Sequence, residues 1–268
     1  MSKKDMTNHD LELVRTEIEI LKICQHPNII QLYDVFENLD YFYIIMEYCS
    51  GGDLFSYLEQ RNFHLPEQLA CKFMHKMCAA VYYIHSYGIA HRDLKPENVL
   101  MTTNDENADL RILDFGLSKI IGPDEKCTEP YGTLSYVAPE VLLDIPYGKE
   151  VDLWSLGVIT YLMLGAALPF DDKNNDEEEI ANKTCYDEPP YKGSIWKKIS
   201  NEGKDFIKRL LEKKPEKRMN IKGALEHEWF HKFDDTKVVL ARRDFDNKDN
   251  AFELYTNPEG LKDKLGKK

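Results

Sequence analysis

His-Arg-Asp-Leu-Lys-Pro-Glu-Asn, residues 91 to 98, is the most informative string in this chain. Two further short strings follow it, Asp114-Phe115-Gly116 and Ala138-Pro139-Glu140. A single tripeptide match carries little weight, because it arises readily by chance. Three such strings in this order and at this spacing indicate a shared function.

The polar residues of these strings are suited to moving a phosphoryl group. Phosphoryl transfer depends on positioning and charge neutralisation more than on covalent chemistry. Asp93 fits a carboxylate that accepts a hydroxyl proton, while Asn98 and Asp114 offer the hard oxygen ligands that Mg²⁺ prefers. Lys95 adds a positive charge beside the transferred phosphate. The alternative is a polar turn between two strands with no catalytic role.

The three strings resemble the catalytic loop, the metal-binding turn and the end of the activation segment of eukaryotic protein kinases. The resemblance covers about residues 10 to 233 and in its details is similar to the calcium/calmodulin-regulated and calcium-dependent protein kinases. The strings that carry this detail are Glu17 to Leu21, His26 to Ile30, Gly51 to Phe55, Gly132 to Glu140 and His227 to Phe230.

This resemblance implies an α+β, protein-kinase-like fold of two lobes, with a truncated small lobe and a mainly helical large lobe. It implies an enzyme that uses ATP and Mg²⁺, and Lys95 is the mark of Ser/Thr rather than Tyr kinases. The expected domains are a partial small lobe over 1–48, a large lobe over 49–233, and a tail or the start of a regulatory segment over 234–268.

Composition limits the partners and the location. A hydrophobic share of 43% and a charged share of 31% are typical of a soluble globular protein. The net charge of −12 disfavours nucleic acid and anionic membranes and favours basic protein substrates. The six cysteines form no CxxC pair, which indicates reduced thiols in a cytoplasmic protein.

Residues 153–170 contain no charged side chain and approach the length of a membrane span. Polar and small residues interrupt this stretch, and acidic residues flank it, so we expect a buried helix and no membrane span. The resemblance places Asp152 beneath the catalytic loop, where it would hold the loop's backbone.

Periodicity predicts the other elements. We expect helices over 9–24, 53–61, 66–87, 202–213 and 220–232, a hairpin of strands over 29–36 and 41–46, and short strands over 99–101 and 110–113. Residues 171–179 are expected to form a solvated acidic loop.

The resemblance assigns five residues to nucleotide binding besides Asp114. Glu17 matches the helix glutamate that pairs with a strand lysine. Met46 would guard the back of the adenine pocket, and the backbones of Glu47 and Cys49 would hydrogen-bond the adenine edge. Leu100 is assigned to the same site.

Substrate-binding and regulatory residues are assigned in the same way. Asp53 and Glu97 match acids that bind an arginine three residues before the target hydroxyl, a charge-assisted contact that guanidinium makes well. Thr133 is assigned to the substrate site. Glu140 and Arg218 match a buried ion pair that ties the activation segment to the large lobe.

Glu129 lies three residues before Gly132, where many relatives carry a phosphorylatable threonine. Its permanent charge could pair with Arg92 and order the segment without phosphorylation. Thr128 is an alternative phosphorylation site. Calmodulin at the short basic stretch 238–243, or a calcium-binding regulatory domain outside this chain, is the candidate regulator.

The sequence departs from the family at its start. It contains no G-x-G-x-x-G loop and no A-x-K string before Glu17, and Lys3 and Lys4 stand too close to Glu17 to match the nucleotide lysine. One explanation is a shortened form of an active kinase, which is favoured because Asp93 and the metal ligands are present. The other is a catalytically inactive, pseudokinase-type interaction protein.

The sequence also contains two candidate metal sites of other kinds. His227-Glu-Trp-Phe-His231 fits the H-E-x-x-H zinc motif, although no third ligand helix is obvious. Acidic residues from Asp244 onward could start an EF-hand loop. That pattern fails, because Asp249 and Tyr255 stand where it needs Gly and Glu.

Overall fold

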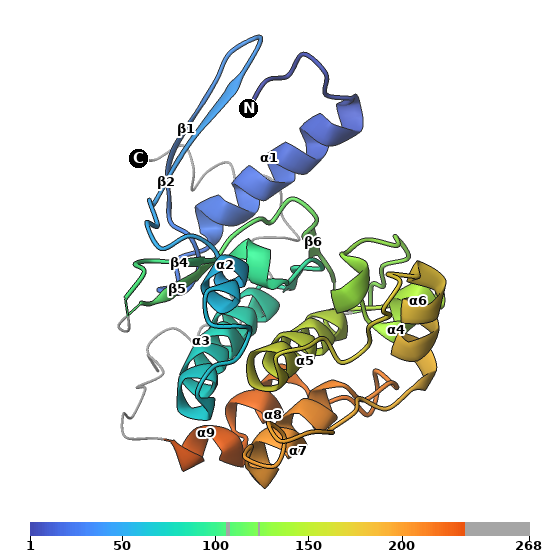
Figure 1. Cartoon of the computed structure of the whole chain (residues 1–268). Coiled ribbons are helices and arrows are strands. Elements are labelled where there is room, and N and C mark those ends of the chain that lie inside the picture. The colour runs from blue at the N-terminus through green and yellow to red at the C-terminus, as the bar shows by residue number, and fades with distance from the viewer. Residues whose placement is uncertain (106–107, 123, 234–268) are drawn as a thin grey trace.

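The protein is described by a computed structural model over residues 1–105, 108–122 and 124–233 (Figure 1). The predicted tail over 234–268 therefore lies outside the described residues. The helices are α1 (Asn8–Ile23), α2 (Leu54–Glu59), α3 (Glu67–Ser86), α4 (Pro139–Leu142), α5 (Glu150–Gly165), α6 (Glu177–Tyr186), α7 (Asn201–Leu210), α8 (Ile221–Leu225) and α9 (Glu228–Lys232). The strands are β1 (Leu32–Glu37), β2 (Phe42–Met46), β3 (Ile89–Ala90), β4 (Val99–Met101), β5 (Leu110–Ile112) and β6 (Lys119–Ile120).

Helix α1 begins at a capping box. The Thr7 side chain accepts a hydrogen bond from the Asp10 backbone N–H, and the Asp10 carboxylate accepts one from the Thr7 backbone N–H at 2.8 Å. Val14, Ile18 and Leu21 are buried at helical spacing. The helix predicted over 9–24 is confirmed.

Strands β1 and β2 form the predicted antiparallel hairpin, although β1 begins only at Leu32. One face packs on α1, where Val14 and Ile18 form a small core cluster with Phe42. Figure 1 shows α1 and this hairpin together at one end of the molecule, away from α5 to α9. A much larger core, to which Ile20 and Leu21 of α1 also belong, holds the helical part together.

Helices α3 and α5 form the centre of that larger core. All residues of α5 from Val151 to Leu164 are buried, and the helix ends where Ala166 takes a left-handed conformation at φ 58°. None of the described helices combines the length and the apolar character that crossing a membrane requires. The interpretation of 153–170 as a buried helix is confirmed, with an earlier end than the sequence indicated.

Two small antiparallel ladders hold the site-bearing loops in place. Strands β3 and β6 pair through Ile89 and Ile120, and β4 pairs with β5 through Leu100 and Arg111. The 91–98 string lies between β3 and β4, and Asp114 follows β5. The pairing of β4 with β5 thus brings the two strings to the same edge.

Three predicted elements need correction. Residues 220–232 are two short helices rather than one, because His227 interrupts the helix and caps α9 by accepting from the Trp229 N–H. The acidic stretch 171–179 is not all loop, because Asp176 caps α6 and residues 177–179 are its first turn. The helix over 202–213 ends at Leu210.

Candidate active site

Asp152 anchors the 91–98 loop from below, as predicted. Its carboxylate, which is fully buried at the start of α5, accepts hydrogen bonds from the backbone N–H groups of His91 and Arg92, both at 2.9 Å. His85 Nε2 lies 2.7 Å from the same carboxylate. Burial opposes ionisation, but the hydrogen bond and charge of His85 and the contacts with His91 outweigh it and lower the pKa of Asp152. These bonds fix Arg92 in a left-handed conformation at φ 67°.

Asp93 lies at the centre of a compact polar group. Lys95 Nζ is 2.8 Å from Asp93 Oδ2, and the Thr133 hydroxyl donates to Asp93 Oδ1 at 2.8 Å. Lys95 also donates to Thr133 Oγ1 at 2.8 Å, which closes a triangle. Asn98 Nδ2 donates to Asp93 Oδ2 at 3.1 Å. These contacts hold the Asp93 carboxylate in a fixed position beside the Lys95 ammonium. A carboxylate that is to accept a proton next to a charged phosphate needs such a fixed position.

Asn98 and Asp114 fit a hard divalent cation. The Asn98 amide nitrogen donates to the Asp93 backbone carbonyl at 2.9 Å, and a carbonyl can only accept, so the Asn98 side-chain oxygen is the atom left for a cation. Asp114 follows β5 in a left-handed conformation at φ 64°, and its Oδ1 accepts from the Gly116 N–H at 3.1 Å. Carboxylate and amide oxygens suit Mg²⁺.

Glu17 of α1 reaches this site from the opposite side. Burial and the nearby charge of Asp114 raise the pKa of Glu17 to about 6, while a backbone hydrogen bond from Phe115 opposes the shift. Lys3 does not reach it: Lys3 Nζ lies 2.7 Å from Glu37 Oε1 on the hairpin. This agrees with the sequence argument that Lys3 is not the nucleotide lysine.

The predicted adenine-binding segment follows β2. Met46 and Cys49 are partly buried and pack against the main core, as does Leu100. The Glu47 backbone N–H donates to the Gln31 carbonyl at 2.8 Å, so its own carbonyl is the group that remains for a ligand. These residues lie where the prediction needs them, and their binding role stays a prediction.

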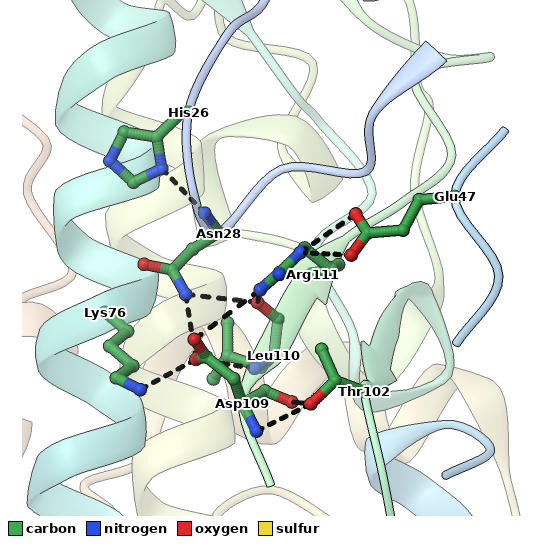
Figure 2. Close-up of polar contacts among 8 residues, drawn as sticks. All are labelled: His26, Asn28, Glu47, Lys76, Thr102, Asp109, Leu110 and Arg111. Carbon is green, nitrogen blue, oxygen red and sulfur yellow. Dashed lines mark hydrogen bonds and ion pairs between the residues drawn. The ribbon is translucent and has the colours of Figure 1, made fainter. Parts of the chain in front are cut away.

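The sequence did not reveal the polar network around Arg111, which Figure 2 shows. Arg111 Nε donates to both carboxylate oxygens of Glu47, at 3.0 and 3.1 Å. Arg111 Nη1 lies 3.6 Å from Asp109, whose carboxylate also binds Lys76 of α3 at 2.7 Å. The Asn28 amide donates to Asp109 at 3.1 Å. The network joins the segment after β2, the β4–β5 ladder, α3 and the loop after α1.

His26 lies at the edge of this network, where its Nδ1 accepts from the Asn28 N–H at 3.0 Å. Burial, with a contribution from the charge of Arg111, lowers the pKa of His26 to about 4. The imidazole is therefore neutral at physiological pH.

The predicted contact between Arg92 and Glu129 is confirmed, with Arg92 Nη1 at 3.3 Å from Glu129 Oε2. Lys119 binds the other carboxylate oxygen at 2.9 Å. The Lys119 hydrogen bond and the charges of Lys119 and Arg92 lower the pKa of Glu129 to about 2, against a smaller opposing effect of burial. The Tyr147 hydroxyl donates to the Glu129 carbonyl at 2.6 Å. Glu129 thus joins three elements as a permanent anion.

Thr128 lies next to this group with an exposed side chain, and its backbone N–H donates to Glu129 Oε2 at 3.2 Å. Its hydroxyl is accessible from solvent. Phosphorylation of Thr128 and the regulatory role of Glu129 stay predictions.

Glu140 and Arg218 form the predicted ion pair. Two parallel bonds of 2.7 and 2.8 Å join the guanidinium to the carboxylate, and the two side chains are 0% and 1% exposed. Arg218 also donates to the carbonyls of Glu150 and Glu212. The pair fixes α4 to the start of α5.

The three residues predicted to bind the substrate, Asp53, Glu97 and Thr133, have different surroundings. Thr133 belongs to the Asp93 group. Glu97 is exposed, whereas the Asp53 carboxylate caps α2 by accepting from the Ser56 N–H at 2.6 Å. Asp53 therefore has a structural role that the sequence did not indicate, and its binding of arginine stays a prediction.

The zinc alternative is not supported. His227 Nδ1 accepts from the Trp229 N–H at 3.1 Å, and its Nε2 lies 3.2 Å from Asp205. Both ring nitrogens are thus engaged, and His227 precedes α9 instead of sharing a helix face with His231. Across the ranges that the structure describes, no group of three or more His, Cys, Asp or Glu residues is arranged to hold a metal ion.

Comparison with known proteins agrees with this geometry. Residues 1–230 match the protein kinase domain family. The chain is 42% identical over 241 residues to CDPK-related kinase 3 of Arabidopsis thaliana, an alignment that covers 89% of this chain and 40% of that protein. It is 43% identical over 221 residues to a probable myosin light chain kinase of Dictyostelium discoideum, covering 81% of this chain and 68% of that protein.

A third relative is the calcium/calmodulin-dependent serine/threonine-protein kinase 1 of Oryza sativa subsp. japonica, 38% identical over 231 residues that cover 86% of this chain and 38% of that protein. The chain thus spans about 40% of the length of the plant relatives it matches. The predicted fold class is confirmed by the family match. The chain belongs to the protein kinase family, and within it to the group that resembles the CDPK-related and calcium/calmodulin-dependent Ser/Thr kinases.

Proposed function

We propose that this chain catalyses the ATP-dependent phosphorylation of serine or threonine in protein substrates. The observation that carries the proposal is the Asp93 carboxylate held by Lys95 and Thr133, with Asn98 connecting it to the expected cation site. Family membership supports the same reaction class. A kinase with these parts would turn over at roughly 1–100 per second.

In the proposed reaction, Asp93 accepts the proton of the substrate hydroxyl as the oxygen–phosphorus bond forms and the bond to the departing nucleotide oxygen breaks. Lys95 supplies positive charge beside the transferred group. Thr133, which is hydrogen-bonded to both Asp93 and Lys95, holds these two side chains next to each other. Mg-ATP, when bound, supplies the phosphoryl group and the cation that neutralises it. Asn98 and Asp114 would hold that cation through their side-chain oxygens.

Adenine binding is proposed for the segment after β2. Met46 and Leu100 would contact the ring, and the free carbonyl of Glu47 and the backbone of Cys49 would hydrogen-bond its edge. The Arg111–Glu47 pair supports this role, because it holds the segment in a fixed position. Glu17 would help to place the phosphates.

The proposed substrates carry basic residues before the target hydroxyl. The net charge of −12 favours such partners. Glu97 is exposed and free to pair with an arginine, while Asp53 would have to do so with the carboxylate oxygen that does not cap α2.

Regulation by calcium is proposed from the relatives. One of them is named as calcium/calmodulin-dependent, so calmodulin or a calcium-binding domain outside this chain is the candidate partner. The basic stretch 238–243 that could bind calmodulin lies outside the described residues. A cytoplasmic location is proposed from the sequence, in which the six cysteines form no CxxC pair.

An inactive interaction protein remains the second candidate. The chain contains no G-x-G-x-x-G loop, and Lys3 pairs with Glu37 instead of Glu17. Glu17 lies beside Asp114, and no ion pair joins its carboxylate to a lysine or arginine of the part of the chain that the structure describes.

The test is transfer of γ-phosphate from Mg-ATP to a peptide with arginine three residues before serine. We expect transfer by the chain and loss of more than about 100-fold in Asp114→Asn, because a metal ligand is removed. The matched control Asp5→Asn, which changes an exposed residue before α1, should keep full activity. Absence of transfer by the unaltered chain, measured together with ATP binding by calorimetry, would favour the inactive alternative.

A further inference from the structure

An apolar groove lies on the large helical part, where it contacts no residue of the Asp93 group. Its volume is about 690 Å³, within the range of roughly 300–1,000 Å³ over which protein pockets hold ligands. The last turn of α3, strand β6, the start of α5 and the segment that leads into α8 form its walls. The apolar lining residues are Tyr87, Ile120, Ile121, Leu153, Met219 and Ile221.

Several of these side chains remain partly exposed. Tyr87, Ile120, Met219 and Ile221 pack against the main core without being buried by it. A contiguous apolar surface of this kind usually marks a place where another segment binds.

Basic residues outnumber acidic ones at the groove, although the chain as a whole is acidic. Lys149 and Arg218 line it with one acid, Glu150, and the exposed side chains next to the lining residues around the start of α8 include Glu216, Lys217 and Lys222. Lys149 Nζ donates to the His85 carbonyl at 2.9 Å, and burial lowers its pKa. The groove therefore favours an occupant that combines aromatic side chains with carboxylates.

This chain contains such a segment. Residues 244–255 read Asp-Phe-Asp-Asn-Lys-Asp-Asn-Ala-Phe-Glu-Leu-Tyr and lie outside the described residues. Phe245, Phe252 and Tyr255 supply aromatic rings, and the segment carries four carboxylates against the single Lys248. The aromatic rings of this segment complement the apolar lining of the groove, and its carboxylates complement the basic residues there.

The distance from α9 to the groove is short enough for residues 244–255 to reach the groove of their own chain. Helices α8 and α9 lie beside α3 (Figure 1), and α9 packs on its first half, where Trp229 Nε1 donates to Glu67 and the Phe230 ring meets His75 edge-on. From His75 to the groove residue His85 the helix rises about 15 Å. Residues 234–244, if extended, reach roughly 36 Å. The linker is therefore long enough.

We propose that residues 244–255 of this chain dock in the groove between α3, β6, α5 and α8, with Phe245 and Phe252 as the apolar anchors. The docked segment would lie against Arg218, which lines the groove and binds Glu140 of α4. The inference concerns a binding surface and needs no phosphoryl transfer, so it can fail or hold independently of the proposed function.

The test is photo-crosslinking in the full chain with Phe252→p-benzoylphenylalanine, followed by peptide mapping. We expect crosslinks to residues 82–88 and 215–221, with a yield that does not change with protein concentration. The same probe at Leu261, beyond the segment, should give at most a fifth of that yield. Ile221→Glu, which places a carboxylate in the groove, should lower the yield at least fivefold, whereas the exposed control Lys208→Glu on α7 should not.

A second measurement avoids changes in the groove itself. In the Phe245→Ser, Phe252→Ser double variant, we expect the amides of Tyr87, Gly88 and Ile121 to exchange at least fivefold faster than in the unaltered chain. A synthetic peptide of residues 244–255 should restore the slow exchange, and a scrambled peptide should not. Crosslinks outside the groove, or unchanged exchange, would overturn the proposal. A yield that rises with concentration would also overturn it, in favour of docking from a second copy.

Discussion

At the scale of single residues, Glu129 is predicted to order the segment around it without phosphorylation. It is bound by Arg92 and Lys119, which come from different parts of the chain. We expect Glu129→Lys to lower the peptide phosphorylation rate by about tenfold or more, because a cation there repels both partners and releases the segment. Initial rates with Mg-ATP measure this.

Glu125→Lys is the matched control, because Glu125 also faces Lys119 but at 3.8 Å and with 49% of its side chain exposed. Its rate should stay within about twofold of the unaltered chain. Equal rates for Glu129→Lys and Glu125→Lys would contradict the structural role of Glu129. Since the pKa of Glu129 is lowered to about 2, its stabilising charge is fully present above pH 4.5 and is lost only as the pH falls through about 2.

His26 makes a pH contribution of the same sign as that of Glu129, but in a higher pH range. Its pKa falls from 6.5 to about 4 on folding, so the unfolded chain binds more protons between these values. The stabilisation by neutral His26 is therefore complete above pH 6.5 and decreases as the pH falls toward 4, with a slope of at most about 1.4 kcal/mol per pH unit.

His26→Asn keeps an acceptor for the Asn28 N–H and does not titrate. We expect the difference in unfolding free energy between the two proteins to shrink by about 1 kcal/mol or more between pH 7 and pH 5. Urea unfolding at each pH measures it. A difference that is independent of pH would show that His26 is not held neutral by the fold.

At the scale of elements, the buried Glu140–Arg218 pair connects α4, α5 and the segment before α8. Removing one partner leaves the other charge buried without compensation, which typically costs about 3–5 kcal/mol. We expect Arg218→Met to lower the unfolding free energy by about that amount, measured by urea denaturation.

The exposed pair of Lys232 and Glu202 provides the comparison, since both side chains are more than a third exposed. Lys232→Met should change stability by about 1 kcal/mol or less. If both substitutions cost the same, the buried pair would not be the main tie between these elements.

Elements with a strong local signal were predictable from the sequence. The long amphipathic helices α1 and α3, the buried helix α5 and the hairpin of β1 and β2 appear close to their expected bounds. The break between α8 and α9 was not predictable from the sequence, because the apolar periodicity continues across it and histidine is an uncommon N-cap residue. Strands β3 and β6, of two residues each, exist only through mutual pairing and give no local signal.

The polar residues of the candidate site also fall into those that the sequence indicated and those that it did not. Asp93, Asn98 and Asp114 could be singled out because their strings have fixed spacing, and their catalytic role stays a prediction. In the structure Asn98 Nδ2 donates to Asp93, and the N–H of Leu113, next to Asp114, donates to the Asn98 carbonyl. Arg111 and Asp109 were missed because their partners are distant in sequence, on the segment after β2 and on α3. A charged residue in a short strand gives no sequence signal for the carboxylate, distant along the chain, that it contacts in the fold.

At the scale of the whole molecule, the unit of α1 and the hairpin is joined to the helical part by Ile20 and Leu21 of α1, which belong to the large core, and by the loop after α1. The loop after α1 contributes backbone bonds from Ile30 to Ile112 and from Ile112 to Asn28, at 3.0 and 2.8 Å. The Arg111 network adds the bifurcated bond from Arg111 Nε to both carboxylate oxygens of Glu47. Since the proposed nucleotide segment begins at this junction, the network should control how rigidly the two parts are joined.

This leads to the last prediction, that Arg111→Met loosens the junction without unfolding either part. A hydrogen bond to a charged group contributes about 1.5–3 kcal/mol, so local opening should become at least about tenfold more frequent. We expect correspondingly faster hydrogen exchange at the amides of Ile30, Glu47 and Ile112, and unchanged exchange inside α5. Arg111→Lys keeps the charge but loses the two-bond contact with Glu47, and should give an intermediate rate.

Arg15→Met is the control, because Arg15 forms a single 3.3 Å contact with Glu37 and is 59% exposed. It should leave exchange at the junction unchanged. Faster exchange throughout the molecule in Arg111→Met would mean that the network stabilises the whole fold instead. Unchanged exchange at Ile30 and Ile112 would mean that the backbone bonds alone hold the two parts together, and that the proposed nucleotide segment does not depend on Arg111 for its position.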